Sequence, residues 1–198
     1  RLYIQASMSA ARALAGTSGV PLREVEVASY WPPGPPLAFL PVALAEAFAG
    51  APDPLPGAWT AAFYGLPPLF LGAAAAAVYA LLRRMGHGER VALATGMIFA
   101  FATLAFIYGR LLFGEGVVVA ALAWAALASR ASRDTGAATL AAAAGLLVGF
   151  AFLQKPVWLL LALPFAGYVA ADGARRVARL ASFAAGLVPP GVLYLAFN

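Results

Sequence analysis

The sequence contains no cysteine, and charged residues are scarce for a chain of its length. The absence of cysteine excludes a disulfide framework and thiol chemistry. Only 11% of the 198 residues are charged, whereas soluble domains carry about 25%. This shortage of charge points to the bilayer, rather than water, as the solvent for most of the chain.

Lysine and histidine are each represented by one residue, Lys155 and His87, so arginine carries almost all of the positive charge. His87 lies in a predicted loop, where a single histidine is more typical of a solvated side chain than of a catalytic or metal-binding group. No cluster of residues has the spacing of metal ligands. We therefore expect neither a metal nor a cofactor.

Apolar residues are abundant, at 63% of the chain, and the mean hydropathy is +0.85. A spanning helix needs about 20 apolar residues, with a range of about 17 to 25. We predict an all-α, polytopic helical membrane protein with about six transmembrane helices. Two of the charge-free runs reach spanning length only with flanking residues included. The runs cover residues 54–82, 91–109, 116–129, 135–154, 156–171 and 180–198.

Residues 1–53 differ from the rest, and we predict two regions: an external first-loop region over 1–53 and a transmembrane bundle over 54–198. Short helices are expected near 3–15 and 37–49, lying along the membrane surface because neither is suited to span. The proline-rich segment 32–36 cannot be helix interior. The chain starts with an arginine and stops inside an apolar run, so we expect it to be an internal part of a longer protein.

Three basic segments separate the apolar runs, at 83–90, 130–134 and 172–179, and they hold eight of the thirteen basic residues. If each run crosses the membrane once, all three lie on one side, which the positive-inside rule assigns to the cytoplasm. This placement explains the net charge of +5 without a nucleic-acid partner. The expected location is the cell (inner) membrane, with several crossings.

The same crossing order puts three isolated charges, Arg110, Glu115 and Lys155, on the extracytoplasmic side. Arg110 and Glu115 are five positions apart, about 140° around a helix, whereas an intrahelical ion pair needs a spacing of three or four. A continuous helix over 91–129 would be about 58 Å long, so a turn near 109–116 is predicted. Ionisable residues at membrane depth mark functional sites by default, although interfacial anchoring remains the simpler alternative.

Four stretches carry a resemblance to a known family: "YGRLLFGEGVVV" (108–119), "LQKP" (153–156), "SYWPPGPPLAFLP" (29–41) and "LYIQASMSAARAL" (2–14). In this order they resemble the GT-C membrane glycosyltransferases. The nearest group comprises the dolichyl-phosphate-mannose protein mannosyltransferases and their bacterial relatives, the aminoarabinose and RgtA/B/C/D-like transferases. Gln154 stands where that group usually has threonine, and Trp31 where it often has lysine or histidine.

The resemblance implies transfer of a sugar from a polyprenyl phosphate to a glycan, lipid or protein acceptor, with inversion at the anomeric carbon and on the extracytoplasmic face. It implies that Arg110 and Lys155 bind the donor phosphate, supported by Glu115. The catalytic acid would stand just ahead of Arg1. Four residues of the external loop could contact the acceptor, although exposed charges and interfacial aromatics are the simpler interpretation: Glu24, Glu26, Tyr30 and Trp31.

Two other classes fit part of the pattern. A transporter fragment would also keep a few charges beside a cavity, but typically near the bilayer midplane on broken helices. A purely structural membrane subunit would have no clustered set of arginine, glutamate and lysine. The sugar, the acceptor and the length of the lipid are not encoded in any motif recognised here.

Overall fold

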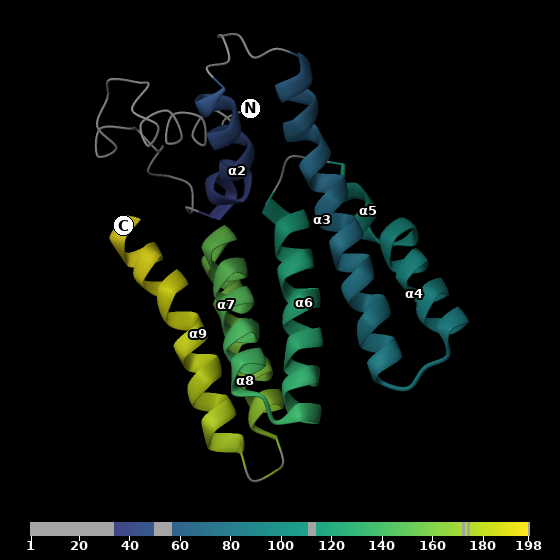
Figure 1. The fold of residues 1–198 in the computed structure, drawn as a ribbon, viewed down its shortest axis with the longest axis vertical. Coiled ribbons are helices and arrows are strands. Elements are labelled where there is room, and N and C mark those ends of the chain that lie inside the picture. The colour runs from purple at the N-terminus through teal and green to yellow at the C-terminus, as the bar shows by residue number, and fades with distance from the viewer. Residues whose placement is uncertain (1–33, 50–56, 111–113, 172, 174, 198) are drawn as a thin grey trace.

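The computed structural model describes residues 34–49, 57–110, 114–171, 173 and 175–197. Throughout this part of the chain the structure is helical and contains no strand, which confirms the predicted all-α class. Most of the helices run along the long axis of the molecule (Figure 1). They are α2 (Gly34–Phe48), α3 (Gly57–Arg84), α4 (Glu89–Ala102), α5 (Leu104–Tyr108), α6 (Gly114–Thr135), α7 (Ala138–Gln154), the 3-10 helix η2 (Pro156–Leu161), α8 (Ala162–Ala170) and α9 (Arg176–Phe197).

Among the described residues, three segments are long and apolar enough to cross a membrane, namely Ala61–Arg84, Gly114–Thr135 and Arg176–Ala196. The protein is thus built like a membrane protein, but the predicted total of about six spans is not confirmed. Helix α7 has 17 residues and rises about 25 Å, less than the roughly 30 Å hydrocarbon core. The segment Pro156–Ala170 is shorter still.

The run predicted as one span over 91–109 is divided at Thr103. This residue has an extended backbone, with φ −123° and ψ 175°, which ends α4. Its hydroxyl accepts a hydrogen bond from the backbone nitrogen of Ala105 and donates one to the carbonyl of Phe99. Threonine hydroxyls compete for backbone groups in this way and favour helix caps. The helix therefore restarts as α5.

The segment 130–134, predicted as a loop, is instead the last part of α6. Arg130 and Asp134 form an ion pair one helical turn apart, with 3.0 Å between Nε and Oδ1, which supports a helix. The hydroxyl of Ser132 donates to the carbonyl of Ala137 and closes the end of the helix. Gly136 then takes φ 71°, a left-handed conformation that suits glycine and stops the helix.

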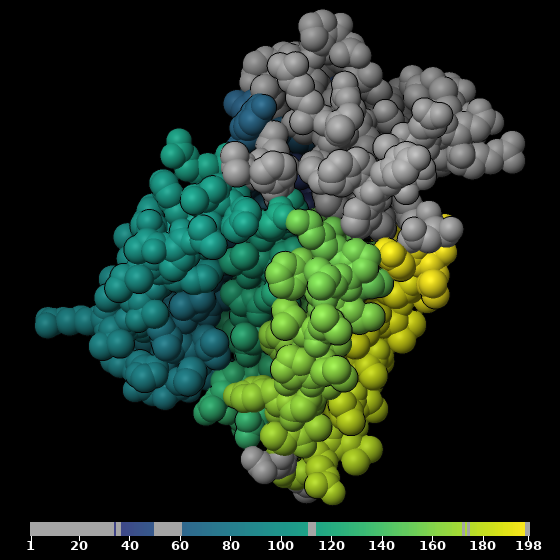
Figure 2. Space-filling view, turned by 180° about the vertical axis from the view of Figure 1, so that it is seen from behind, coloured from purple at the N-terminus to yellow at the C-terminus, as the bar shows by residue number. Residues whose placement is uncertain are grey.

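Helices α7 and α9 cross closely because glycines stand at their contact. A Cβ atom added at Gly145 would overlap the carbonyl oxygen of Phe183, and one at Gly186 would overlap the carbonyl oxygen of Ala142. Small residues allow such close approach between helices in membranes. Seen from behind, α9 forms one edge of the molecule and the teal residues of α3 to α5 form the other (Figure 2).

Helix α2 begins at Gly34, three residues before the predicted start. The two prolines that follow stand in its first turn, where a missing backbone N–H costs nothing. Phe39 is buried against Phe63 of α3, with 6.3 Å between ring centroids. In Figure 1 α2 runs along the long axis beyond the end of α7, and its expected placement along the membrane surface stays a prediction. The helix expected near 3–15 lies outside the described residues.

Candidate functional site

Glu115 and Lys155 meet at the end of the bundle opposite to the arginine-rich segments. Glu115 stands in the first turn of α6, and Lys155 directly follows the last residue of α7. Although they are 40 positions apart, Lys155 Nζ donates to Glu115 Oε1 in an ion pair. The two helix ends favour these charges, since the macrodipole is positive at the start of α6 and negative at the end of α7.

Pro156 explains why Lys155 can reach across to α6. A residue before proline is driven out of the helical region, and Lys155 has an extended backbone with φ −153° and ψ 126°. Helix α7 therefore ends at Gln154, and the chain turns into η2. The break at this position follows the "LQKP" motif, whereas the 3-10 geometry of the next six residues has no clear sequence signal.

The two partners of the pair differ in exposure. The Glu115 side chain is 20% exposed and that of Lys155 is 52% exposed. An ammonium group has three donor hydrogens, so Lys155 can hold Glu115 and still approach an anion from the solvent side. Because ion pairs this exposed contribute only about 0 to 1 kcal/mol to stability, stability alone is a weak reason for placing these charges at a membrane surface.

Arg110 lies at the same end, after α5, but it does not join the pair. Its side chain is exposed, and its guanidinium carbon lies 5.5 Å from the centroid of the Phe106 ring. Its backbone nitrogen donates to the carbonyl of Ile107. Among the described residues no contact connects Arg110 with Glu115 or Lys155. The structure thus brings together two of the three predicted residues, and the predicted roles of all three stay predictions.

Gln154, beside Lys155, is a buried polar residue whose importance the sequence only hinted at. It is 1% exposed, and neither atom of its amide has a hydrogen-bond partner among the described residues. The indole nitrogen of Trp158 in η2 is also buried and has no hydrogen-bond partner among the described residues. An unsatisfied buried polar group costs about 1 to 3 kcal/mol, so this junction is suited to form hydrogen bonds with a ligand or with water.

Glu46 in α2 is a second residue that sequence reasoning missed. It is fully buried and has an interaction partner in the structure, as expected for a buried carboxylate. The available signal was a single acid inside the otherwise uncharged segment Leu37–Phe48. A lone acid in a short apolar helix is a weak signal, because its neighbours along the chain do not reveal what covers it.

The remaining predicted site residues, Glu24, Glu26, Tyr30 and Trp31, lie outside the described residues. Within the described ranges, no group of three or more His, Asp or Glu side chains could hold a metal ion. Compared with protein-family models, with curated proteins and with solved structures, the chain matches none. The family resemblance therefore depends on the motifs alone.

Proposed function

We propose that this chain forms part of a GT-C-type membrane glycosyltransferase, which moves a sugar from a polyprenyl phosphate to an acceptor on the extracytoplasmic face. The observation that supports it best is the ion pair between Glu115 and Lys155. Each of the two residues belongs to one of the four stretches that carry the family resemblance, and they meet although they are distant in the chain. The cationic partner is the more exposed of the two.

The reaction needs positive charge next to the lipid phosphate, which is the leaving group. The bond between the anomeric carbon and the phosphate oxygen breaks, and its electron pair moves onto the lipid phosphate. Preorganised cations stabilise that developing charge. Lys155 would meet the phosphate as a point charge, and Arg110 would meet it with two parallel hydrogen bonds. The proton of the acceptor hydroxyl would pass to the carboxylate base expected ahead of Arg1.

Glu115 has a supporting role in this proposal. It fixes the position of Lys155 and reduces the cost of holding a cation at the membrane boundary. Arg110 would leave the face of Phe106 to reach the phosphate. An exposed cation–π contact of this kind is worth only about 0.5 to 1 kcal/mol, less than a charge-assisted pair with phosphate provides, at about 1.5 to 3 kcal/mol. The amide nitrogen of Gln154 and the indole nitrogen of Trp158 would donate hydrogen bonds to the donor sugar or phosphate, and the amide oxygen of Gln154 would accept one from a sugar hydroxyl.

The proposal includes a crossing order with about six membrane passages. Helices α3, α6 and α9 would cross the membrane fully. The other three passages would be formed by the α4–α5 pair, by α7 and by the η2–α8 pair. In Figure 1 α3 and α6 run in one direction along the bundle, and the α4–α5 pair, α7 and α9 run in the other. The shorter members would reach the two surfaces with flanking residues such as Lys155 and the turn at 109–110, because polar residues beside a short span are tolerated there.

A transporter is the competing class, and the break at Thr103 between α4 and α5 favours it, since transporters use discontinuous helices. Their charged sites lie near the bilayer midplane, however. Glu115 lies 19 positions, or about 28 Å, from Asp134 along α6, so the ion pair is at one end of a helix that is about as long as the membrane is thick.

Sugar transfer by the full-length natural protein in isolated membranes tests the proposal. Lys155→Ala should lower the turnover rate by about 10²–10³, the usual effect of removing one preorganised donor, while the amount of protein in the membrane is unchanged. Arg176→Ala is the matched control, because Arg176 is an exposed cation at the other end of the bundle. It should transfer sugar at the wild-type rate.

A charge exchange separates catalysis from simple anchoring. The double variant Glu115→Lys with Lys155→Glu can form the same ion pair with its direction reversed, so it should recover part of the thermal stability that Lys155→Glu alone loses, although both charges then oppose the helix macrodipoles. It should not recover sugar transfer, since the cation now stands on α6 instead of next to η2. Wild-type transfer by Lys155→Ala, or full transfer by the exchanged variant, would mean that the pair only holds the helices together.

A further inference from the structure

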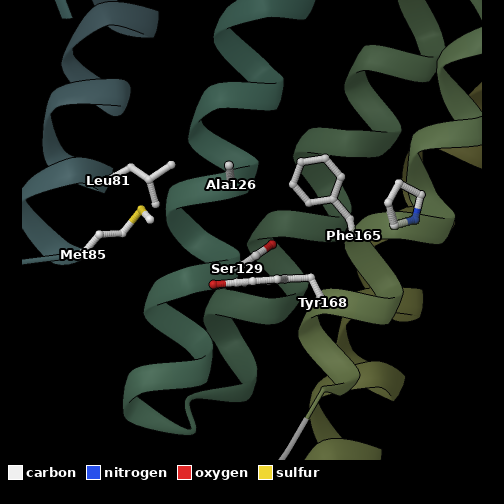
Figure 3. Close-up of a pocket in the computed structure, with 7 residues that line it drawn as sticks. Leu81, Met85, Ala126, Ser129, Phe165 and Tyr168 are labelled. Carbon is white, nitrogen blue, oxygen red and sulfur yellow. The ribbon is translucent and has the colours of Figure 1, made fainter. Parts of the chain in front are cut away.

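A cavity of about 350 Å³ opens near the arginine-rich end of the bundle, at the end opposite to Glu115 and Lys155. This volume is at the lower end of the range of about 300–1,000 Å³ that is typical of ligand pockets. Helix α6 lies between α3 on one side and α8 on the other (Figure 3). We call this cavity the α6 slot. Its walls include Leu81, Met85, Ala126, Ser129, Phe165 and Tyr168.

Each of the three helices contributes two of these side chains, about one turn apart. The members nearer the arginine-rich end are Met85, Ser129 and Tyr168, and those three or four positions deeper in the bundle are Leu81, Ala126 and Phe165. The α6 slot thus follows the helices for about one turn, or about 5 Å. Its deeper part is walled by hydrocarbon side chains, and its polar atoms lie at the end nearer the arginines.

The hydroxyl of Ser129 is the unused polar group of the slot. Ser129 is fully buried, and its oxygen has no hydrogen-bond partner among the described residues. A serine inside a helix can bond to the carbonyl four positions earlier, but this hydroxyl instead points into the space between the labelled side chains (Figure 3). Because the bilayer core supplies no water, a hydroxyl there costs free energy until a ligand provides its partner.

The other hydroxyl of the slot, that of Tyr168, is already engaged. It has a side-chain hydrogen bond with Arg130, and the guanidinium carbon of Arg133 lies 4.5 Å from the centroid of the Tyr168 ring. Arg130 also contacts Asp134, with 3.0 Å between Nε and Oδ1. Both arginines therefore have partners within the protein. The group that can select a ligand for the slot is the Ser129 hydroxyl, not their charge.

We propose that the α6 slot binds the ester end of an acyl chain of a membrane glycerolipid, and that the ester carbonyl accepts a hydrogen bond from the Ser129 hydroxyl. The first methylenes of the chain then lie one turn deeper, between Leu81 and Phe165. The depth agrees, because Ser129 directly precedes Arg130, whose ion pair with Asp134 is about one-third exposed. Such a pair belongs in the polar layer of the membrane, and the esters of glycerolipids lie where that layer meets the hydrocarbon.

Other occupants match the slot less well. A buried water needs about two to four polar partners, and the lining side chains of the slot offer only the hydroxyls of Ser129 and Tyr168. A polyprenyl chain has no carbonyl oxygen for Ser129. A helix from a second copy of the chain would use its backbone carbonyls internally. The inference is independent of the proposed function, and requires only that the arginine-rich end faces a membrane surface.

A matched pair of lipids tests the ester contact. The probes are phosphatidylcholine with ester-linked chains and the same lipid with ether-linked chains, each with a photoreactive group near the head-group end of one chain. Titrated into the purified full-length protein in detergent, the ester form should crosslink to residues such as Met85 and Phe165. It should bind about fivefold more tightly than the ether form, the effect of one neutral hydrogen bond.

The matched variants are Ser129→Ala and Ser182→Ala, the second of which lies on α9 and outside the slot. In Ser129→Ala the ester and ether forms should bind equally, because the donor of the hydrogen bond is gone. Ser182→Ala should keep the fivefold difference. Equal affinity of the two forms for the wild type, or an unchanged preference in Ser129→Ala, would overturn the proposal.

A further variant fills the slot without changing a polar group. Ala126→Trp should remove the crosslinks of both lipids, whereas Ala184→Trp on the exposed face of α9 should keep them. Displacement of the ester probe by polyprenyl phosphate at lower concentrations than by phosphatidylcholine would contradict the assignment. An absence of crosslinks at Met85 and Phe165, as when a second copy covers the slot, would contradict it too. If Ala126→Trp does not fold, Ser129→Ala still decides.

Discussion

The two ends of the helical bundle use charge in different ways. At the arginine-rich end, Asp134 is shared by Arg84 and Arg130, and each of these side chains is about one-third exposed. At the opposite end, Glu115 meets Lys155 from a different part of the chain, next to the buried amide of Gln154. The first end carries several arginines, and the second carries one acid and one lysine that contact each other.

This difference separates two reasons for placing charge at a membrane. Repeated basic residues are typical of segments at a cytoplasmic membrane surface, where no single one of them is essential. A single lysine held by a glutamate, beside buried polar groups without partners, is an arrangement in which position matters. Among the described residues, the second end therefore fits the proposed site for chemistry better than the first.

The largest effect should be on labelling from the two sides of the membrane. The sequence has no cysteine, so single cysteines can be introduced at two exposed positions, Gly88 and Arg110. In intact cells an impermeant thiol reagent should label Arg110→Cys and leave Gly88→Cys unlabelled until the cells are opened. Labelling of both cysteines in intact cells would show that the two ends do not face opposite sides.

The smallest effect should come from the arginine-rich end. Asp134→Asn removes the acid shared by Arg84 and Arg130, but exposed ion pairs contribute only about 0 to 1 kcal/mol. Its thermal unfolding midpoint in detergent should fall by less than about 4 °C, and its rate of sugar transfer should match the wild type. A loss of sugar transfer as large as that expected for Lys155→Ala would contradict the proposal that only the Glu115–Lys155 end takes part in the reaction.

Some helix breaks were predictable from a proline or a glycine, whereas the break that depends on a hydroxyl was not, and α3 and α9 each continue through a pair of prolines. Pro156 indicates the end of α7, and the charges and glycines around 109–116 indicate that α5 and α6 are separate helices. Thr103 carries no such signal, because a threonine inside an apolar run fits a continuous helix as well as a cap. The sequence did not predict that α6 continues through Arg130, because a cluster of charges indicates a membrane surface but not the end of a helix.

The sequence predicted at which end of the bundle the candidate residues lie, but it did not predict which of them contact each other. Crossing order places Arg110, Glu115 and Lys155 at one end, yet it does not fix how each helix is rotated about its axis. Rotation decides that Lys155 meets Glu115 and that Arg110 lies over Phe106. The burial of Gln154 depends on α2, because Gly34 packs directly against the backbone of Leu153 and Gln154. No local pattern encodes that long-range contact.

The central claim is that the Glu115–Lys155 end binds the phosphate of a polyprenyl donor, and direct binding tests it best. The probe is polyprenyl phosphate without sugar, titrated into the purified full-length protein, with Lys155→Ala and Arg176→Ala compared side by side. Loss of a charge-assisted contact costs about 1.5 to 3 kcal/mol, so Lys155→Ala should bind at least about tenfold more weakly, while Arg176→Ala binds like the wild type. Equal affinities for all three proteins, or equal weakening in both variants, would contradict the account.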